Sequence, residues 1–392
     1  MRVHRIAVLG GGPAGLYFSY LWKRRHPEDQ VDVFERNPEG ATFGFGVVFS
    51  DKALDFLRVD DPETAEAITA RMETWRDITL VHLGERVVID GVGFSAVGRL
   101  EFIKQLTQRA RSVGVTLRFE TAVHSLDELD GYGLIVAADG VNSLVRRTYE
   151  GDFKTLLSCD DNKFVWYGTT KRFETLTQTF VETKFGSFNA HHYRYSPTMS
   201  TFIVECDRST WLRAGFAEKT EKETRAICES VFSDTLDGHQ LVNNKSIWRN
   251  FPWIWNERWS HRNMVLVGDA LHTAHFSIGS GTRLALEDVI ALTNALDNEP
   301  CDLRAALEAY EAARRPVVEK LVKAAKTSAS WYQNFPEHMK LAPFDFGYSY
   351  ITRSGRIDDD QLRAASPRFM ERYDAHSSHQ NESRSAENSH VG

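Results

Sequence analysis

The residues with the clearest chemical meaning are three glycines near the N-terminus. The segment GGGPAG places Gly10, Gly12 and Gly15 directly after the apolar run RIAVL. Glycines at this spacing allow a tight turn, close approach of a pyrophosphate and close packing of the next helix. The following apolar run, VDVFER, contains Glu35, whose carboxylate can accept hydrogen bonds from ribose hydroxyls. Strand, helix and acidic residue together favour a dinucleotide site over an unrelated glycine-rich turn.

A second glycine-rich segment lies about 250 residues further along the chain. Residues 263–281 read NMVLVGDALHTAHFSIGSG, an apolar run followed by Gly268-Asp269 and by a loop with Gly279 and Gly281. A helical pattern follows, and a helix N-terminus presents free N–H groups to negative charge. Asp269 can accept a hydrogen bond from a sugar or ribityl hydroxyl. Because FAD is long and its ribityl chain and ring need a second docking loop, we predict FAD rather than NAD at this pair of motifs.

The surrounding pattern predicts the elements that must position these loops. Short apolar strands alternate with helices up to about residue 155, which is typical of a buried parallel sheet. Residues 156–261 instead contain aromatic and β-branched runs typical of antiparallel strands. We predict an α/β fold with a discontinuous Rossmann-like FAD-binding domain, an inserted, mostly antiparallel sheet domain for the substrate, and C-terminal helices. The predicted boundaries are 1–72, 99–155 and 262–335 for the FAD domain, 73–98 and 156–261 for the sheet domain, 336–375 for a C-terminal helical or interface segment, and 376–392 for a disordered tail.

Composition narrows the class of protein further. The chain has 392 residues, 42% of them hydrophobic, and a net charge of −7, so we expect no nucleic-acid partner. No apolar run approaches the ~20 residues that span a membrane, and the first strand leaves no room for a signal peptide. The four cysteines are scattered without metal-ligand spacing, so we expect no metal. We predict a cytoplasmic enzyme, either a monomer or a homodimer.

A third motif completes a recognisable set. LIVAADGVNSLVRR (134–147) ends an apolar strand in Asp139-Gly140 and continues to Arg146. Alone, this could be an ordinary turn. Taken in order, GGGPAG, DGxNSxVR and GDALH resemble the motifs of single-component FAD-dependent aromatic hydroxylases, the p-hydroxybenzoate hydroxylase-like class. The resemblance covers about residues 1–335.

This resemblance implies roles for matching residues. Arg99 would contact the ribityl–pyrophosphate region, and Asp139 and Arg146 would serve both FAD and the pyridine nucleotide. Asp269 would bind the ribityl chain. A helix N-terminus at the flavin N1/C2-carbonyl edge would favour reduction. The full predicted FAD set is Gly10, Gly12, Pro13, Ala14, Gly15, Glu35, Arg36, Gly46, Val47, Arg99, Asp139, Arg146, Asp269, Gly279, Gly281 and Thr282.

One departure from the family pattern points to a narrower branch. Members usually have proline at the position of Phe276, whereas HFSIGSG and FGFGVVFSDKAL (43–54) resemble the branch of salicylyl-CoA 5-hydroxylase, anthraniloyl-CoA monooxygenase and the violacein-pathway monooxygenase. Gly46 and Val47 would then lie beside the flavin ring. The chain ends near residue 390 without the reductase half of the anthraniloyl-CoA enzyme, which favours salicylyl-CoA or a related aryl-CoA substrate.

The resemblance also implies the reaction. NADH or NADPH would reduce FAD, O2 would add at flavin C4a, and the resulting hydroperoxide would transfer oxygen to an electron-rich ring. A phenol hydroxyl directs oxygen to its para carbon, so a salicylyl ring would give a gentisyl product. The site must exclude water to protect the hydroperoxide.

No single catalytic base is evident in the sequence. In NAHHYRYS (189–196), His191, Tyr193 and Tyr195 share one strand face and could bind the phenol oxygen. They could equally be an amphipathic sheet face with satisfied hydrogen bonds. His275 lies on the predicted flavin-side loop, and the predicted catalytic residues are His191, Tyr193 and His275.

Other functions stay open at this point. The same chemistry could act on anthraniloyl-CoA, an indole derivative or another free aromatic compound. Trp253-Ile254-Trp255 is similar to the start of the WxWxIP motif of flavin-dependent halogenases, but Asn256-Glu257 stand where Ile-Pro should follow. A non-enzymatic module with a decayed nucleotide site is disfavoured by the intact glycines and by the acidic residues of the three motifs.

Overall fold

The N-terminal unit folds as its glycine spacing predicts. The computed structural model describes residues 3–50 and 53–389, so Asp51 and Lys52 of the 43–54 segment lie outside the described residues. Strand β1 (Arg5–Leu9) leads through the glycine loop into α1 (Pro13–Arg25), and β2 (Gln30–Phe34) returns parallel to β1. Three of the five residues of β2 and four of β1 are buried, as expected for strands covered on both faces.

These strands belong to a six-stranded sheet that brings the three motifs together. Its order is β16-β17-β9-β1-β2-β8, and every neighbouring pair is parallel except β16–β17. The carboxyl ends of β1, β9 and β17 therefore lie side by side, and each leads directly into one motif loop. Ligands of open α/β sheets bind at this edge. The remaining strands are β8 (Thr116–Arg118), β9 (Leu134–Ala137), β16 (Ser260–His261) and β17 (Met264–Leu266).

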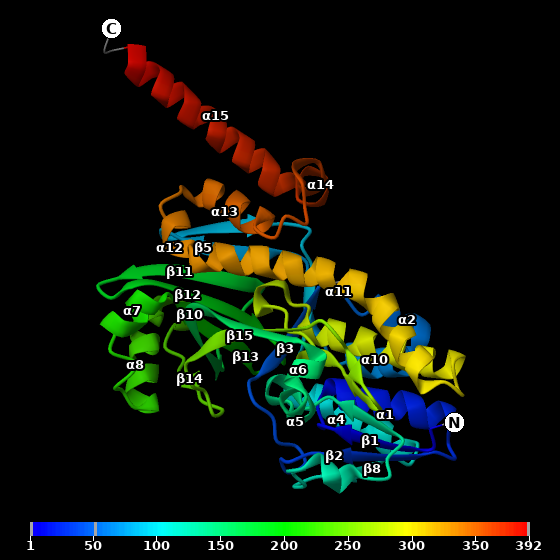
Figure 1. Cartoon of the computed structure of the whole chain (residues 1–392). Helices are drawn as coiled ribbons and strands as arrows, with labels where there is room; N and C mark the ends of the chain where they lie inside the picture. The colour runs from blue at the N-terminus through cyan, green and yellow to red at the C-terminus, as the bar shows by residue number, and fades with distance from the viewer. Residues whose placement is uncertain (1–2, 51–52, 390–392) are drawn as a thin grey trace.

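Helices α1, α4 (Arg99–Ser112) and α10 (Gly281–Asn298) accompany this sheet (Figure 1). Their apolar side chains join the strands in one large buried cluster, which is the core of the nucleotide-binding part. Short helical pieces connect the strands: η1 (Leu126–Leu129), η2 (Gly140–Asn142), α5 (Leu144–Thr148), α6 (Glu150–Phe153), η3 (Gly268–Ala270) and η4 (Phe276–Ile278).

A second sheet is mainly antiparallel and eight-stranded. Its order is β14-β10-β13-β12-β11-β5-β6, with β15 paired to β10, and only β11–β5 is parallel. Strands from residues 78–89 thus join strands from residues 155–256, and the predicted domain boundaries remain a prediction. The strands are β5 (Ile78–His82), β6 (Glu85–Ile89), β10 (Thr155–Thr169), β11 (Leu176–Thr183), β12 (Gly186–Arg194), β13 (Ser200–Cys206), β14 (Leu241–Val242) and β15 (Arg249–Asn256).

Alternation along these strands divides the sheet into two faces. Val204 and Phe202 pack with α7 (Arg208–Arg213), α8 (Glu221–Val231) and α9 (Ser233–Leu236) in one buried cluster. Ile203, between them, points to the opposite face and lines a cavity. The predicted period of two is therefore confirmed, and His191 and Tyr193 lie on the cavity face.

A small three-stranded sheet connects the two larger ones. Strands β3 (Gly46–Ser50), β7 (Phe94–Gly98) and β4 (Glu73–Trp75) pair in the order β3-β7-β4. The helices α2 (Asp55–Asp60) and α3 (Pro62–Thr69) lie between β3 and β4 in the chain. Because β7 leads directly into α4, this sheet places the loop around Gly46 close to the N-terminus of that helix.

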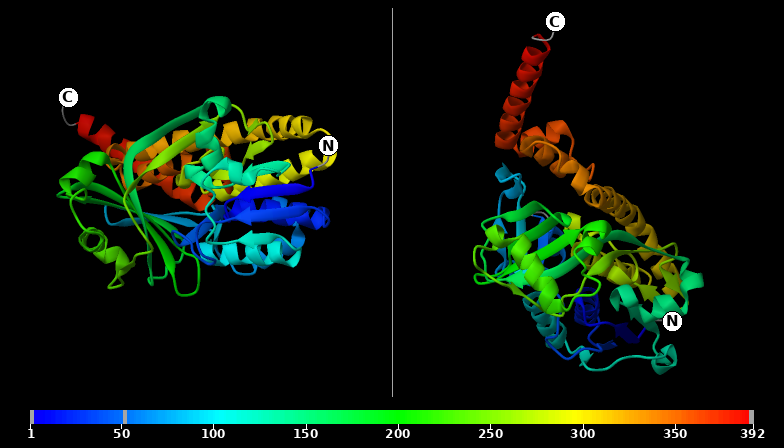
Figure 2. Two further views of the ribbon diagram at one scale, coloured as in Figure 1. Left: turned by 60° about the horizontal axis from the view of Figure 1, so that its bottom comes forward. Right: turned by 90° about the vertical axis from the view of Figure 1, so that its left-hand side faces the viewer.

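The C-terminal part is helical. The long helix α11 (Leu303–Gln333) runs from the first sheet to the second and is followed by α12 (Phe335–His338), α13 (Pro343–Thr352), α14 (Asp359–Ala365) and α15 (Pro367–Ser389) (Figure 1). The views in Figure 2 show α15 extending away from the rest of the molecule. We expected residues 376–392 to be a disordered tail because they lack apolar periodicity, whereas the structure continues α15 to Ser389. The helix begins against the core, where Phe369 and Met370 are buried, and the polar turns continue a helix that is already formed.

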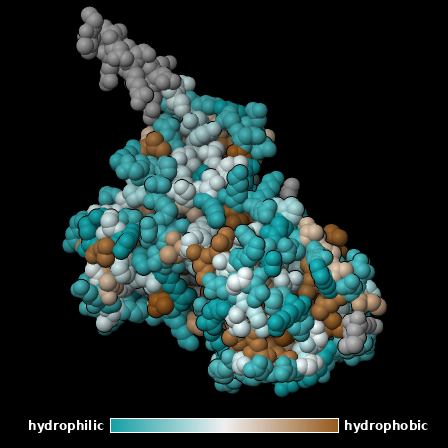
Figure 3. Space-filling model, viewed as in Figure 1, coloured by the Kyte–Doolittle hydropathy of each residue, from teal (hydrophilic) through white to brown (hydrophobic). Residues whose placement is uncertain are grey.

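The outer surface is mainly hydrophilic on the face shown in Figure 3, with hydrophobic side chains in small separate groups. None of the helices in the described ranges has the length and apolar character needed to cross a membrane. The mixed α/β fold class is as predicted.

Candidate active site

One cavity of about 1070 Å³ connects the edge of the first sheet with the inner face of the second. At one end it is lined by residues of all three motif loops. At the other end it is lined by side chains of β10, β11 and β12 and by residues of α13 and of the loop after η3. Residues that we predicted for FAD and that line it are Gly10, Gly12, Pro13, Ala14, Glu35, Arg36, Gly46, Val47, Arg99, Asp139, Asp269, Gly279, Gly281 and Thr282.

The N-terminal glycines have different physical roles. Gly10 has φ +102°, and a side chain there would meet the Ala138 carbonyl group. Gly12 has open space on its Cβ side, with no described protein atom within 4 Å. Gly15 lies behind the loop instead of lining the cavity, and a Cβ atom there would lie 2.0 Å from the Gly10 carbonyl oxygen. Gly12 thus leaves room for a ligand, whereas Gly15 allows the loop itself to form.

Glu35 is anchored at the same end of the cavity. One carboxylate oxygen accepts a hydrogen bond from the Gly11 N–H at 2.8 Å, and the other accepts from the backbone and side chain of Asn37 at 2.8 and 2.7 Å. The oxygen that accepts from Gly11 keeps a second lone pair. The side chain is therefore held in place and can still accept from a ribose hydroxyl.

The second motif lines the cavity with Asp139 and its neighbours and also braces the loops. One oxygen of Asp139 accepts from the Leu144 N–H at 2.7 Å, and its other oxygen is buried without a partner among the described residues. Arg146 does not line the cavity. It donates to the carbonyl oxygens of Ala270 at 3.0 Å and Val141 at 2.5 Å, and so joins the second motif to the third. Its neighbour Arg147 lines the cavity wall instead.

Asp269 and Arg99 form the polar centre of the cavity. Burial raises the pKa of Asp269, while the positive charge of Arg99 opposes that rise. Burial also lowers the pKa of the Arg99 guanidinium, against the effect of Asp269, and its Nε has no partner within the described part of the chain. A buried donor and a cavity-facing carboxylate without protein partners fit a ligand with phosphate and hydroxyl groups. These residues therefore fit FAD.

The third motif ends in a helix N-terminus at the cavity wall. Gly279 has φ +61°, ends η4, and lets the chain turn into α10 at Gly281. The first N–H groups of α10 are free to meet negative charge. The Gly46 N–H donates to the Thr201 hydroxyl at 2.9 Å and its carbonyl accepts from the Tyr193 hydroxyl at 3.0 Å. A Cβ atom at Gly279 would lie 3.6 Å from Val48 of β3, so the Gly279 loop and the strand that begins at Gly46 lie close together.

His191 stands at the other end of the cavity and is almost fully buried, with 6% exposure. Its Nδ1 lies 2.8 Å from Gln178 Nε2, and its ring stacks on Tyr332 with centroids 5.1 Å apart. Burial lowers its pKa, which Glu205 partly opposes. The imidazole is therefore neutral near pH 7, and its Nδ1 accepts from the Gln178 amide.

Tyr193 is a donor instead of a base. Its hydroxyl is bonded to the Gly46 carbonyl, and burial raises its pKa further above the ordinary value. Tyr195, on the same strand face, packs against Gly46 and Gly98 and does not line the cavity.

His275 lies behind the residues that line the cavity and does not face the cavity itself. It is 2% exposed, accepts from the Ser277 N–H at 3.3 Å, and stacks against Phe276 with centroids 4.2 Å apart. Burial lowers its pKa to about 4. Phe276, not His275, reaches the cavity, because the short 3₁₀ turn directs successive side chains to different sides.

Sequence reasoning missed two polar residues of this wall. Gln178 is the cross-strand neighbour of His191, which only the strand register reveals. Arg353 directly follows α13, far along the chain, and donates to Ser328 Oγ, Tyr350 O and Ser277 O at 3.1, 2.6 and 2.8 Å. None of these partners is a carboxylate, so its positive charge is available to a substrate.

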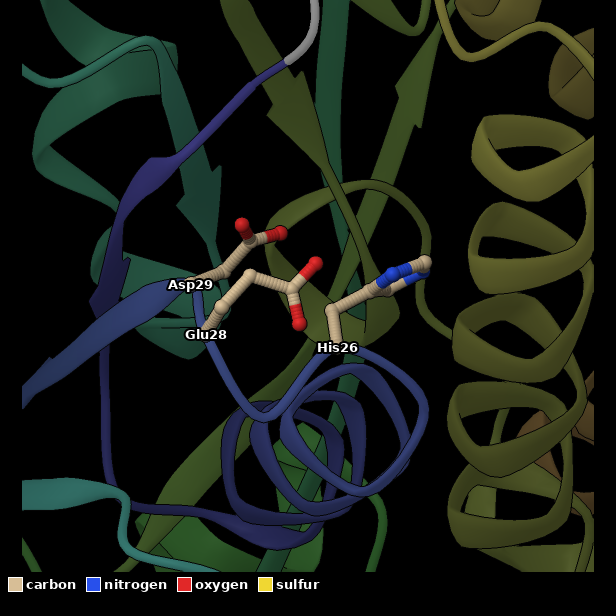
Figure 4. Close-up of side chains that lie close together, drawn as sticks. All are labelled: His26, Glu28 and Asp29. Atoms are coloured by element: carbon tan, nitrogen blue, oxygen red, sulfur yellow. The ribbon is translucent and has the colours of Figure 1, made fainter.

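A cluster of potential metal ligands lies at the other end of α1 from the cavity. His26, Glu28 and Asp29 converge there, with ligand atoms within 4.8 Å of one another (Figure 4). Asp29 already accepts from Trp22 Nε1 at 3.1 Å and contacts His4, and His26 lies 2.6 Å from Asp297. The cluster is thus tied into the protein's own hydrogen bonds.

Comparison with known proteins agrees with this geometry. The family model described as FAD binding domain matches residues 4–325. The chain is 40% identical to salicyloyl-CoA 5-hydroxylase of Streptomyces sp over 380 residues, which is 94% of this chain and 73% of that protein. It is 36% identical to 3-hydroxy-4-methyl-anthranilyl-[aryl-carrier protein] 5-monooxygenase of Streptosporangium sibiricum, over 90% of this chain and 95% of that one. Among solved structures, P. aeruginosa PqsL with 2-aminobenzoylacetate shares the fold at TM-score 0.67 and 20% identity, covering 84% of this chain and 96% of that one.

Proposed function

We propose that this chain, which belongs to the FAD binding domain family, hydroxylates a salicylyl ring held as its CoA thioester. The chain is an FAD-dependent aromatic monooxygenase, as its relatives are. The proposal concerns the substrate and the ring position, para to the phenol hydroxyl.

The observation that carries the proposal is the continuity of the cavity. One wall holds the dinucleotide loop, Arg99 and Asp269, and the same space continues to His191, Gln178 and Arg353. A ring placed against Phe276 and His191 would lie next to the loops around Gly46 and Gly279, where the resemblance places the flavin ring. The arrangement supports a reaction between an aromatic ring and a bound flavin.

FAD, when bound and reduced by NADH or NADPH, supplies the activated oxygen for this reaction. Glu35 and the loop from Gly10 to Ala14 would hold its ADP part, Arg99 its pyrophosphate, and Asp269 its ribityl hydroxyls. Gly46, Gly279 and the N-terminus of α10 would hold its ring.

The protein's own contribution at the other end is to activate the ring. His191 and Gln178 would bind the phenol oxygen, because an oxygen that is ionised or hydrogen-bonded pushes more electron density to the para carbon. Arg353 would stabilise the negative oxygen or the thioester carbonyl through its unshared charge. Phe276, Phe164 and Trp166 line the same space and would exclude water from it.

Two relatives support a carrier-linked substrate. One is named for a CoA-linked salicyloyl group and the other for an anthranilyl group on an aryl-carrier protein. A ring that arrives on a long carrier arm must enter from the protein surface, and this cavity is open rather than sealed along that path, since exposed Phe43 and Arg249 are among its lining residues. NADH as the preferred donor, a cytoplasmic location and a monomeric or dimeric state stay predictions.

The test is flavin reduction by NADH in the presence of salicylyl-CoA, free salicylate, anthraniloyl-CoA or tryptophan, followed by mass analysis of the product. We expect salicylyl-CoA alone to accelerate reduction and to gain one oxygen atom at the carbon para to its hydroxyl. If anthraniloyl-CoA or a free aromatic compound accelerates flavin reduction instead, the enzyme is still a monooxygenase but the proposed substrate is wrong. The halogenase alternative, suggested by Trp253-Ile254-Trp255, predicts a chloride-dependent product whose mass differs from that of the hydroxylated product.

A further inference from the structure

An aromatic ring and two cations lie where the cavity opens beside the second sheet. Phe43 lines the cavity and is 41% exposed. The ammonium group of Lys245 lies 5.1 Å from the centre of the Phe43 ring. Arg249 also lines the cavity and is exposed, whereas the other described residues of the second sheet that line it are buried or half-buried. We call Phe43, Lys245 and Arg249 the rim.

The loop that carries Phe43 is held in place by its neighbours. Asn244 Nδ2 donates to the carbonyl oxygens of Thr42 and Gly44, on either side of Phe43, at 3.1 and 2.9 Å. Asn244 directly precedes Lys245 in the chain, so one turn both holds this loop and supplies a cation. An exposed ring on a fixed loop can stack on a flat ligand with little further loss of conformational freedom. The position of Phe43 therefore suits a ligand that contains a flat ring.

The two cations of the rim have no acidic partner. Within residues 3–50 and 53–389, neither the Lys245 ammonium nor the Arg249 guanidinium forms an ion pair or a side-chain hydrogen bond. The whole chain carries a net charge of −7, so the rim differs in sign from the molecule as a whole. Arginine offers a planar pair of N–H donors to a phosphate group, and lysine offers a point charge. A ring beside two such cations fits a nucleotide, whose base stacks and whose phosphates are bound.

Strand β10 connects the rim with the inner end of the cavity. Phe164 and Trp166 are two residues apart on this strand, and both line the cavity. Trp166 lies next to the rim loop, since a Cβ atom at Gly44 would be 2.9 Å from its ring. Phe164 lies next to the inner end, since its ring centroid is 4.9 Å from that of Phe276. These side chains form an apolar strip along which an extended arm can lie.

The same strip contains an unsatisfied hydrogen-bond donor. Trp166 Nε1 is buried and has no hydrogen-bond partner within the described part of the chain. A buried donor without a partner is costly, so its position suits a ligand that supplies an acceptor. The pantetheine arm of CoA is mostly apolar but contains amide groups, and an amide carbonyl can accept from this N–H. This observation is independent of the charges on the rim.

We propose that the rim binds the nucleotide of a CoA thioester, with the adenine ring on Phe43 and the phosphates on Lys245 and Arg249, and that Trp166 Nε1 binds an amide carbonyl of the pantetheine arm. This inference rests on the proposed function only in requiring a CoA-linked substrate, and not on the identity of the aromatic ring. A carrier protein is disfavoured as the occupant, because a protein partner needs a contact area far larger than one ring and two cations. NADH and NADPH contain an adenosine diphosphate group as CoA does, and the experiment separates these sources.

The first experiment measures binding without turnover. Wild-type, Lys245→Ala, Arg249→Ala and Lys222→Ala enzymes, all loaded with FAD, are titrated with free CoA in a calorimeter. Lys222 is the matched control, an exposed lysine on α8, which packs on the face of the second sheet opposite the cavity. We expect the Kd for CoA to rise about tenfold in each rim variant and to stay at the wild-type value in Lys222→Ala. The KM for NADH in flavin reduction is measured for the same proteins.

Turnover of two thioesters then tests each part of the ligand. In Lys245→Ala, Arg249→Ala and Phe43→Leu, the ratio of kcat/KM for salicylyl-CoA to that for salicylyl-pantetheine should fall about tenfold, because only the first contains the nucleotide. Trp166→Phe keeps an aromatic ring but removes the N–H group, so the KM for both thioesters should rise about tenfold with the FAD absorbance unchanged. A purely structural role for the rim would change both thioesters alike and leave the ratio at its wild-type value.

The outcomes separate this inference from the proposed function. If salicylyl-CoA is hydroxylated but the rim variants bind CoA as the wild type does, the rim assignment is overturned and the proposed function stands. If the wild type binds CoA through the rim but hydroxylates another aromatic thioester, the salicylyl ring is wrong and the rim assignment stands. Unchanged CoA affinity with a raised KM for NADH would assign the rim to the pyridine nucleotide and overturn the inference. Equal use of salicylyl-CoA, salicylyl-pantetheine and a carrier-linked salicylyl group by the wild type would also overturn it.

Discussion

The Tyr193 hydroxyl donates a hydrogen bond to the Gly46 carbonyl oxygen at 3.0 Å, which fastens the second sheet to the loop that faces the cavity. Both residues line the cavity, and they lie 147 positions apart in the chain. The Gly46 N–H also donates to the hydroxyl of Thr201 on the same sheet at 2.9 Å, so two buried hydrogen bonds hold the second sheet against this loop. Tyr193 therefore fixes the position of the Gly46 loop, a role that its place on the strand face alone does not predict.

Replacing Tyr193 by phenylalanine should therefore act on stability and coupling. The Gly46 carbonyl would lose a buried donor, and we expect the free energy of unfolding to fall by about 1–3 kcal/mol. Turnover should fall by less than tenfold, because a tyrosine whose pKa is raised by burial acts as a donor and not as a base. Chemical denaturation and product per NADH consumed are the measurements, with Tyr195→Phe as the matched control. A loss of turnover above 100-fold would make Tyr193 a direct participant.

Substitutions of Gly12 and Gly15, both in the first motif, should have different effects: one on FAD binding and the other on the stability of the apoprotein. Gly12→Ala adds a methyl group where no described protein atom lies within 4 Å, and its backbone, with φ −81° and ψ −178°, suits alanine. The apoprotein should keep its stability while FAD binding is lost. In Gly15→Ala, the added methyl group meets the Gly10 carbonyl oxygen, so the apoprotein itself should lose about 1–3 kcal/mol or more. Denaturation of both apoproteins and FAD titration distinguish them; equal stability loss in the two variants would contradict this division.

Much of this arrangement could be predicted from the sequence because local pattern determines it. The glycine spacing, the acidic residue after β2 and the alternation along β12 all depend on neighbours within a few residues. Glu205 and Gln178 could not be assigned, since their contact with His191 depends on the register of three strands. Arg353 reaches the cavity only through the packing of α13, which no local pattern encodes. His275 was placed on the right loop, but the side to which a short 3₁₀ turn points its side chains is set by tertiary packing.

Asp269 should control FAD affinity. In Asp269→Ala the ribityl hydroxyls would lose an acceptor in the cavity, and we expect FAD to bind about 10- to 100-fold more weakly. Asp237→Asn, an exposed carboxylate paired with Lys171, is a matched control that should bind FAD as the wild type does. Fluorescence titration of the apoproteins gives both dissociation constants. Unchanged affinity in Asp269→Ala would remove this residue from the FAD site.

His275 should make the folded state sensitive to acid. Its pKa is lowered to about 4 by burial, so between about pH 6.5 and pH 4 the unfolded chain binds a proton that the folded chain does not. The stability that this neutral histidine contributes is complete above pH 6.5 and is lost as the pH falls towards 4. The difference amounts to about 3 kcal/mol at most. Unfolding in urea between pH 4.5 and 7.5 should show a flatter acid limb in His275→Gln than in wild type or in His239→Gln, a surface control.

Phe276 allows the departure from the family pattern to be tested directly. Phe276 is the first residue of η4, and the N–H group at the first position of a helix has no partner within that helix. His275 before it has φ −53° and ψ 137°, the conformation favoured before proline. Phe276→Pro should therefore leave the backbone and FAD affinity nearly unchanged. The phenylalanine ring, however, contacts Phe164 and His191, with centroids 4.9 and 5.4 Å apart. Its loss should raise the KM for the aromatic substrate at least tenfold, because one wall of the ring site disappears. Phe276→Leu, which keeps apolar bulk, should lie between proline and wild type. If Phe276→Pro instead loses FAD and keeps its KM, the ring holds the loop and not the substrate.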